Sequence, residues 1–393
     1  MCGLDPAAKS LSNSRCMSFT FIHTADWQLG KSFGQFPAET AGALRLARQN
    51  VIIRIAQAAR EAGGRHVLVA GDVWDSKIPS NATLRQPLTI LGEAPDLQWW
   101  LLPGNHDPDG TDGLWDRIGE IKPENVHSLR RAEPVEIEDG VFILPAPWSR
   151  IQHGEDLTAW MAGCETPKGA LRIGLAHGGV RGFGSEAQEG REIIPPDRAK
   201  TAQLDYLALG DWHARAEISP RCFYSGTPEP DRHKSGARGQ VLAVTLTPGQ
   251  DAKVSDIATA NYDWPLCALV LEPQIAEEQL KRLRSDLMQG HPLRRTQVRL
   301  DVSGDMTAED WRAFEKFAEE MSGECASFEV RGTEAVGLVI IPEDIEALDA
   351  QGSVREAAEV LAAQSTDIDL SKTDRQIASE ALRLLFRYAG ERA

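Results

Sequence analysis

Short apolar runs alternate with helical patterns over about the first 260 residues of the chain. Phe19–Thr24, His66–Ala70 and Gln98–Leu102 have the length of buried strands, whereas Ala43–Glu61 repeats its apolar positions at helical spacing. Further strands are predicted at Val141–Leu144, Leu171–Ala176, Tyr206–Leu209 and Val241–Leu246. This alternation predicts an α/β fold in which helices cover the faces of the sheets.

The pattern changes near Asn261–Pro265, beyond which strands and helices follow in the order β-α-β-α-β. That order favours a small α+β domain of ferredoxin-like type, and two more helices end the chain. The expected divisions are a disordered extension over 1–17, a catalytic domain over 18–262, an α+β capping domain over 263–345 and C-terminal helices over 346–393.

The composition fits a protein of two or three domains, because 42% of its 393 residues are hydrophobic and can bury a full core. No apolar stretch approaches the ~20 residues that span a bilayer, so no membrane association is expected. The first 18 residues are polar and do not resemble a secretory signal. Six scattered cysteines without a C-x-x-C pair are typical of reduced thiols, and we expect a cytoplasmic protein.

The charge is unevenly distributed. Residues 1–250 hold 26 Lys and Arg against 30 Asp and Glu, whereas residues 251–393 hold 16 against 28. An acidic surface disfavours tight, sequence-blind binding to long duplex DNA. It leaves a nuclease open, because a few local cations and two metal dications can reverse the field inside a cleft.

Five short polar segments each follow a predicted strand: Asp26-Trp27-Gln28, Gly71-Asp72, Gly104-Asn105-His106-Asp107, His177 and Gly210-Asp211-Trp212-His213. Taken singly, each has an ordinary alternative as a turn, a helix cap or a structural histidine. Together they offer carboxylate, amide and imidazole ligands for two divalent metal ions. Two cations ~3.5–4 Å apart clamp a phosphate and lower the pKa of a water, and a carboxylate such as Asp72 can bridge them. The set therefore indicates a metal-dependent phosphoesterase.

The order of these segments resembles that of the calcineurin-like metallophosphoesterases. Phe21–Gly30 and Tyr224–Glu229 are similar to motifs of the DNA-repair nuclease branch, which includes the SbcD-type nuclease subunits. The resemblance covers about residues 19–250. It implies a β-sandwich of the four-layer type flanked by helices, with a smaller capping domain after it.

The resemblance also implies roles for single residues. One metal would be held by Asp26, Gln28, Asp72 and His213, and the other by Asp72, Asn105, His177 and Asp211. His106 would face the substrate phosphate, as an electrostatic stabiliser or a general acid. Asp107 would fix the tautomer of His106 and raise its pKa through a hydrogen bond.

Two positions depart from the family pattern, because Gln28 and Asp211 stand where the family usually has histidine. Both changes replace nitrogen by oxygen donors, which favours Mn²⁺, with Mg²⁺ as the alternative, over Zn²⁺. The other interpretation is a decayed site that holds one metal or none.

Candidate substrate contacts are Arg181 and Phe183 in the loop after His177, and Arg215 after His213. They could meet phosphate or base, although ordinary surface charge is the better explanation for any single cation. The last helix carries an apolar stripe at Ile377, Ala381, Leu384, Leu385 and Tyr388. This stripe could bind an ATPase or another repair protein, or simply pack on the capping domain.

The leading hypothesis is a Mn²⁺-dependent nuclease that cleaves single-stranded DNA in repair, as an endonuclease or an exonuclease. A second hypothesis keeps the enzyme but gives it a small nucleotide-like phosphoester as substrate. A third is a non-catalytic adaptor with a decayed metal site.

Overall fold

The computed structural model describes residues 18–111, 113–149, 154–183, 192–233, 238–339 and 352–390. The extension expected at residues 1–17 lies outside them. The chain divides into two compact units, one made of Met1–Pro230 and Gly236–Asn261, the other of Asp231–Ser235 and Tyr262–Ala393.

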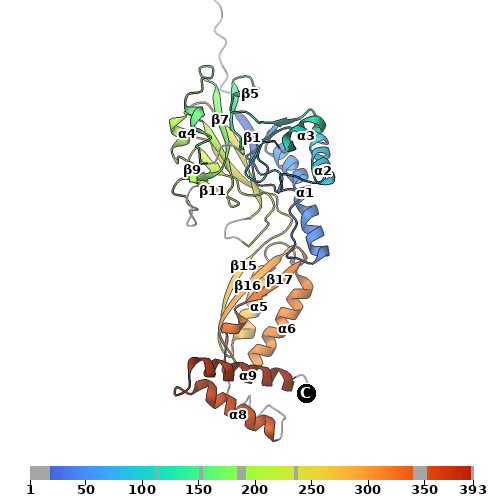
Figure 1. Ribbon diagram of the computed structural model, residues 1–393, viewed down its shortest axis with the longest axis vertical. Helices are drawn as coiled ribbons and strands as arrows, with labels where there is room; N and C mark the ends of the chain where they lie inside the picture. The colour runs from blue at the N-terminus through green and yellow to red at the C-terminus, as the bar shows by residue number, and fades with distance from the viewer. Residues whose placement is uncertain are drawn as a thin grey trace, which may run out of the picture. The chain divides into compact units, whose positions relative to one another are not determined.

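The first unit contains two six-stranded sheets (Figure 1). The first sheet has the order β14-β13-β1-β2-β3-β4. Its strands are β1 (Phe19–Thr24), β2 (His66–Val69), β3 (Gln98–Leu101), β4 (Val126–Ser128), β13 (Gln240–Leu246) and β14 (Lys253–Ala258). Strands β1 to β4 pair in parallel, and β13 pairs antiparallel with both β1 and β14.

The second sheet has the order β11-β12-β10-β7-β6-β5. Its strands are β5 (Val135–Glu138), β6 (Val141–Ala146), β7 (Leu171–His177), β10 (Tyr206–Gly210), β11 (Ala216–Ser219) and β12 (Cys222–Tyr224). The four inner strands pair in parallel, and the two edge strands are antiparallel to their neighbours. A short parallel pair, β8 (Gly179–Val180) and β9 (Glu192–Ile194), lies apart.

Three apolar cores hold this unit together. Phe21 of the first sheet and Tyr206 of the second lie in a core between the sheets. Outside the first sheet, helices α1 (Ala38–Glu61), α2 (Asn81–Gly92) and α3 (Leu114–Ile121) pack against residues such as Trp99. The third core lies outside the second sheet and includes α4 (Arg198–Thr201) and the 3₁₀ turn η1 (Ala159–Ala162). The expected mixed α/β architecture is therefore confirmed.

The second unit has a parallel sheet. Strands β15 (Leu266–Leu271), β16 (Gln297–Met306) and β17 (Ser327–Arg331) all pair in parallel, as does the short β18 (Gly337–Leu338) with the end of β16. The ferredoxin-like prediction is thus wrong. Helix α5 (Ala276–Leu287) joins β15 to β16, and α6 (Ala308–Glu324) joins β16 to β17. Such a crossover returns the chain in the same direction.

The last two helices, α8 (Ser353–Thr366) and α9 (Lys372–Gly390), pack against each other. The buried positions on α9 are Ala378 and Leu382, whereas Ile377 and Leu384 of the predicted stripe are exposed. Ala381 and Leu385 of the stripe are half-buried, and the side chain of Tyr388 lies outside the described residues. Within the described residues, no helix combines the length and apolar character needed to cross a membrane.

Candidate metal centre

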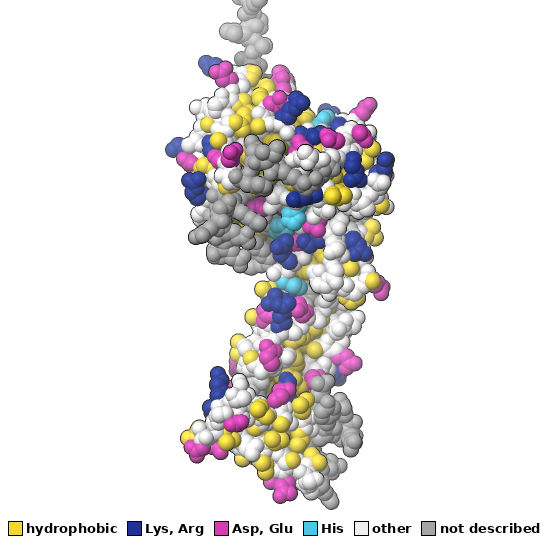
Figure 2. Space-filling view, in the orientation of Figure 1, with side chains coloured by type: hydrophobic (Ala, Val, Ile, Leu, Met, Phe, Trp, Pro, Cys, Tyr) yellow, Lys and Arg dark blue, Asp and Glu magenta, His cyan; other side chains and the backbone are white. Residues whose placement is uncertain are grey.

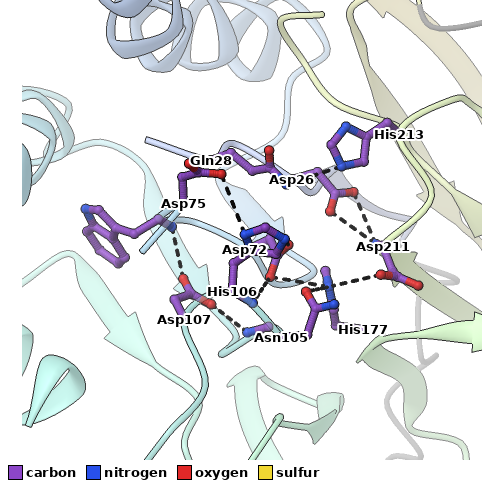
Figure 3. Close-up of polar contacts among 12 residues, drawn as sticks. Asp26, Gln28, Asp72, Asp75, Asn105, His106, Asp107, His177, Asp211 and His213 are labelled. Carbon is purple, nitrogen blue, oxygen red and sulfur yellow. Dashed lines mark hydrogen bonds and ion pairs between the residues drawn. The ribbon is translucent and has the colours of Figure 1, made fainter. Parts of the chain in front are cut away.

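The predicted ligands gather where strands of both sheets end (Figure 3). From the first sheet come the residues that follow β1, β2 and β3, and from the second those that end or follow β7 and β10. They are Asp26, Gln28, Asp72, Asn105, His177, Asp211 and His213. Residues far apart in the sequence thus meet at the carboxyl ends of parallel strands, where α/β proteins bind ligands.

The backbone at this edge is left-handed at four of the predicted ligands. Asp26, Gln28, Asp72 and Asp211 have φ angles of 55°, 43°, 55° and 98°, and they are four of seven non-glycine residues with positive φ among the described residues. Such conformations cost roughly 1–3 kcal/mol each and persist only where surrounding structure imposes them. Here the first two ligand loops, which follow β1 and β2, are joined by hydrogen bonds. Asp26 N donates to Gly71 O (3.1 Å) and Gln28 N to Asp72 O (2.9 Å).

Two glycines allow the strand ends to approach closely. A Cβ atom on Gly104 would lie 2.2 Å from Asp72 Oδ1, and one on Gly210 would lie 2.0 Å from Ala70 O and 2.8 Å from His177 Nδ1. Any side chain at either position would push a ligand away. The glycines therefore set the spacing of the centre.

Asp26, Asp72 and His177 form the innermost group, with one ligand atom from each lying within 4.8 Å of the others. All three are buried. His177 Nδ1–H donates to Ala70 O (2.8 Å), which turns Nε2 toward the centre. Nε2 lies 3.3 Å from Asn105 Oδ1, 3.4 Å from Asp72 Oδ1 and 3.8 Å from Asp211 Oδ1. One imidazole nitrogen among three oxygens fits a divalent ion.

The electrostatics of this group favour a cation. Burial raises the pKa of Asp26 to about 6, and the carboxylates of Asp72 and Asp211 add to the rise against the opposing pull of His213 and His177. Burial lowers the pKa of His177, but the same three carboxylates outweigh it and raise the pKa to about 9. A cluster that draws protons this strongly also draws a metal ion, which competes for the same positions.

Gln28 and His213 lie on the other side of the centre. The Gln28 amide nitrogen is 3.3 Å from His213 Nε2, and because an amide nitrogen can only donate, that histidine nitrogen is the acceptor. Its lone pair is therefore directed at the Gln28 amide. The Gln28 amide oxygen accepts a hydrogen bond from Lys31 Nζ at 3.1 Å.

The predicted partnership between Asp107 and His106 is wrong. Asp107 is buried and accepts hydrogen bonds from the backbone N–H groups of Gly104 (2.7 Å) and Trp74 (3.0 Å), so it ties two ligand loops together. Burial raises the pKa of the Asp107 carboxyl well above its usual range. His106 Nδ1 instead lies 3.6 Å from Asp75 Oδ1, and its Nε2 is 4.0 Å from Asp72 Oδ2.

Asp75 was not predicted from the sequence, although the Asp-x-x-Asp spacing from Asp72 could have indicated a second carboxylate beside the same loop. Its side chain is 25% exposed, and that of His106 is 44% exposed. An accessible imidazole at the rim of the centre is placed where a substrate can reach it, with a carboxylate to orient it.

The candidate substrate contacts have different surroundings. Phe183 is half-buried and packs on Trp212 and Tyr224, with ring centroids 5.4 and 5.6 Å away, and its stacking on a base stays a prediction. Arg215 Nε lies 3.4 Å from Asp256 Oδ1, and its guanidinium covers the Phe223 ring.

Arg181 directly follows β8, and its side chain is exposed. Its backbone N–H donates to Ile194 O at 2.9 Å. Of the three candidate contacts, it is the one whose side chain is most open to solvent.

Buried polar side chains hold the first ligand loop from behind. Arg48 of α1 donates to Trp27 O (2.6 Å) and Glu229 O (2.6 Å), and the Thr227 hydroxyl donates to Asp26 O (2.9 Å). Arg48 was missed in the sequence, where its place among the apolar positions of a helix was the available signal. These contacts give the 224–229 segment a role in positioning Asp26.

Comparison with known proteins gives a family match. The family model described as calcineurin-like phosphoesterase matches residues 19–220. No curated protein matches the chain. One similar solved structure is purple acid phosphatase PPD1 from yellow lupin (Lupinus luteus) seeds, with a TM-score of 0.38 and 11% identity. The match covers 62% of this chain and 52% of that one, so this chain spans about half the length of the phosphatase.

Proposed function

The chain belongs to the calcineurin-like phosphoesterase family, and from that premise we propose that it is a metal-dependent DNA nuclease that acts on single-stranded DNA in repair. The observation that carries the proposal is the convergence of Asp26, Asp72 and His177, buried and within 4.8 Å of one another, at the ends of strands from two sheets. A partner ATPase or another repair protein, bound through the C-terminal helices, belongs to the same proposal.

The donor set divides into two sides that share Asp72. Asp26, Gln28 and His213 would hold one ion, and Asn105, His177 and Asp211 the other. When bound, two divalent ions neutralise the phosphoryl oxygens and make a water-derived nucleophile accessible at neutral pH. His106, held beside Asp75, would donate a proton to the leaving oxygen or stabilise its charge.

Support for DNA as the substrate comes from the two motifs that resemble the repair nucleases. Residues 21–30 and 224–229 are far apart in the sequence, yet Thr227 and Arg48 join them at the backbone of Asp26 and Trp27. Both motifs thus serve one ligand loop. On the face shown in Figure 2, the Lys and Arg side chains are interspersed with Asp and Glu, and such a mixed surface disfavours a long duplex footprint.

The metal we propose is Mn²⁺. Five of the seven donor side chains offer oxygen, namely Asp26, Gln28, Asp72, Asn105 and Asp211. Oxygen-rich sites favour Mn²⁺ or Mg²⁺ over Zn²⁺. Metal-depleted protein should therefore regain its highest turnover with Mn²⁺, and a higher turnover with Zn²⁺ or Ni²⁺ would contradict the choice.

The decisive assay uses purified protein and Mn²⁺ with linear and circular single-stranded DNA, beside a chromogenic phosphodiester. The wild type should cleave DNA, Asp72→Ala should not, and Asp96→Asn should behave as the wild type because Asp96 pairs with Arg60 on the surface. Cutting of circles would identify an endonuclease. Cleavage of the small ester alone would favour a small phosphoester substrate, and inertness toward every ester would favour an adaptor.

A further inference from the structure

A lysine belongs to the same loop as the Gln28 ligand. Lys31 Nζ donates to Gln28 Oε1 at 3.1 Å and lies 4.0 Å from Asp75 Oδ1. The Lys31 backbone N–H also donates to Gln28 O (3.3 Å), which closes a tight turn between them. Its side chain is 22% exposed, so the ammonium is held at the edge of the centre and does not extend into solvent.

This contact occupies the one atom of Gln28 that can ligate a hard metal ion. An amide nitrogen has no lone pair available for coordination, so only Oε1 can serve as a ligand. Lys31 binds that oxygen, while the amide nitrogen faces His213. A metal ion on this side must therefore displace the ammonium from Oε1 or bind close to another positive charge.

The His177 side of the centre has a different arrangement. There, the imidazole Nε2 faces oxygens of Asn105, Asp72 and Asp211 at 3.3 to 3.8 Å. Two of these three oxygens belong to carboxylates, and the third is an amide oxygen turned toward the same point. These donors already converge, whereas the oxygen of Gln28 is engaged by a cation.

We propose that the Lys31 ammonium supplies positive charge on the Gln28 side of the centre, so that the chain binds one divalent ion tightly on the His177 side and the other ion weakly. Asp75 positions both the ammonium and the His106 imidazole, since it lies between them. The inference rests on the two-ion centre of the proposed function, but it does not depend on DNA being the substrate.

The test is a metal titration of the full chain without DNA. Equilibrium dialysis against Mn²⁺, with bound metal counted by mass spectrometry and free Mn²⁺ by electron paramagnetic resonance, gives the number of ions and their affinities. For the wild type we expect one tight ion and a second bound about 100-fold more weakly. Lys31→Met should tighten the weak site by about tenfold or more, because the competing charge is gone.

Two further variants make the result specific. Lys31→Arg keeps the charge and should keep the wild-type pattern. Lys253→Met removes an exposed lysine of β14 and should also leave both affinities unchanged. Circular dichroism establishes that each variant is folded, and Lys31→Gln replaces Lys31→Met if the latter is not.

Two ions of affinity within tenfold of each other in the wild type would overturn the inference, as would an unchanged weak site in folded Lys31→Met. Failure to bind any ion would overturn the centre itself. The expected titration together with no cleavage of DNA would leave this inference standing and refute the nuclease proposal.

Discussion

The two units of the chain use the same strand–helix–strand connections to different ends. In the first unit, parallel strands from two sheets end at one place and bring Asp26, Asp72 and His177 together. In the second, a single parallel sheet ends in ordinary connections, such as the turn in which Thr307 and Asp310 form a capping box for α6. Among the described residues, Asp26, Asp72 and His177 form the one group of three or more His, Cys, Asp or Glu side chains whose ligand atoms lie close enough together for a metal ion.

The difference teaches that alternating strands and helices provide a scaffold and do not by themselves create a site. The first unit adds left-handed backbone at its ligands and glycines that remove steric barriers between strand ends. The second unit also has left-handed backbone near the ends of its strands, at Gln274 (φ 70°) and Gly332 (φ 84°), but among the described residues no group of candidate metal ligands gathers there. Substitutions at the two kinds of strand end should therefore have unlike consequences.

The largest expected effect is that of Asp72→Ala. The carboxylate faces His177 Nε2 and accepts the His106 backbone N–H, so its loss removes the ligand shared by both sides of the centre. Phosphodiester hydrolysis should fall by about 10³-fold or more. Because the change also relieves repulsion among buried carboxylates, the melting temperature should not fall in proportion. A rate within tenfold of the wild type would contradict the assignment.

Replacing Arg48 by Met should have the largest effect on stability. The buried guanidinium satisfies the carbonyls of Trp27 and Glu229, and its removal leaves both without that donor. We expect a loss of about 3 kcal/mol in the free energy of unfolding, measured by urea denaturation. Arg45→Met on the same helix is the control, since Arg45 is exposed and its loss should cost less than about 0.5 kcal/mol.

The acid sensitivity of the first unit should depend on His23. Its Nε2–H donates to Leu209 O, the Tyr206 hydroxyl donates to its Nδ1, and burial lowers its pKa from 6.5 to about 3. Between pH 6.5 and 3, His23 is therefore protonated in the unfolded chain and neutral in the folded chain. This contribution to stability is complete above pH 6.5 and declines as the pH falls toward 3, by about 1.4 kcal/mol per pH unit.

The measurement is the free energy of unfolding at pH 7, 6 and 5 for the wild type and His23→Gln. Asp26 contributes with the opposite sign, because its raised pKa means that the folded chain takes up a proton first as the pH falls. The difference between the two proteins cancels that contribution. Equal slopes in both proteins would show that His23 is not the acid-sensitive group.

The smallest effect is expected at a strand end of the second unit. Asp310→Ala removes the acceptor of the Thr307 backbone N–H and of Gln274 N, and should cost about 1 kcal/mol. The number of bound Mn²⁺ ions and the rate of hydrolysis should stay at wild-type values. A change in either would mean that the second unit participates in the chemistry after all.

The strands of the first unit and the convergence of its candidate ligands could be predicted from the sequence, because their signals are local. Asp72 directly follows an apolar run, and His177 ends one. The contacts that hold the surrounding side chains and loops in place could not be predicted in the same way. Asp75 meets His106, and Arg48 meets Glu229, across loops whose conformations depend on the whole fold. Asp107 was expected to bind His106 because the two are adjacent in the sequence. Its side chain instead accepts hydrogen bonds from the backbone of Gly104 and Trp74.

The second unit was harder to predict for a related reason. The sequence predicted the order of its strands and helices correctly. It did not predict that neighbouring strands pair in parallel, because that direction depends on how each connecting helix crosses the sheet. On α9, the sequence does not show which apolar residues are buried, because the exposed Ile377 is as apolar as the buried Leu382.

The hydrogen bonds that join the first two ligand loops have a consequence for how the protein matures. Asp26 and Gln28 are fixed by hydrogen bonds to the backbone of Gly71 and Asp72, which form without a bound ion. The conformational entropy of these loops is therefore lost when the sheets form, and metal binding need not order them. We therefore expect newly made chains to fold first and bind metal afterwards. Chelators should accordingly abolish phosphodiester hydrolysis without unfolding the protein. Hydrolysis should return when metal is added, without a refolding step.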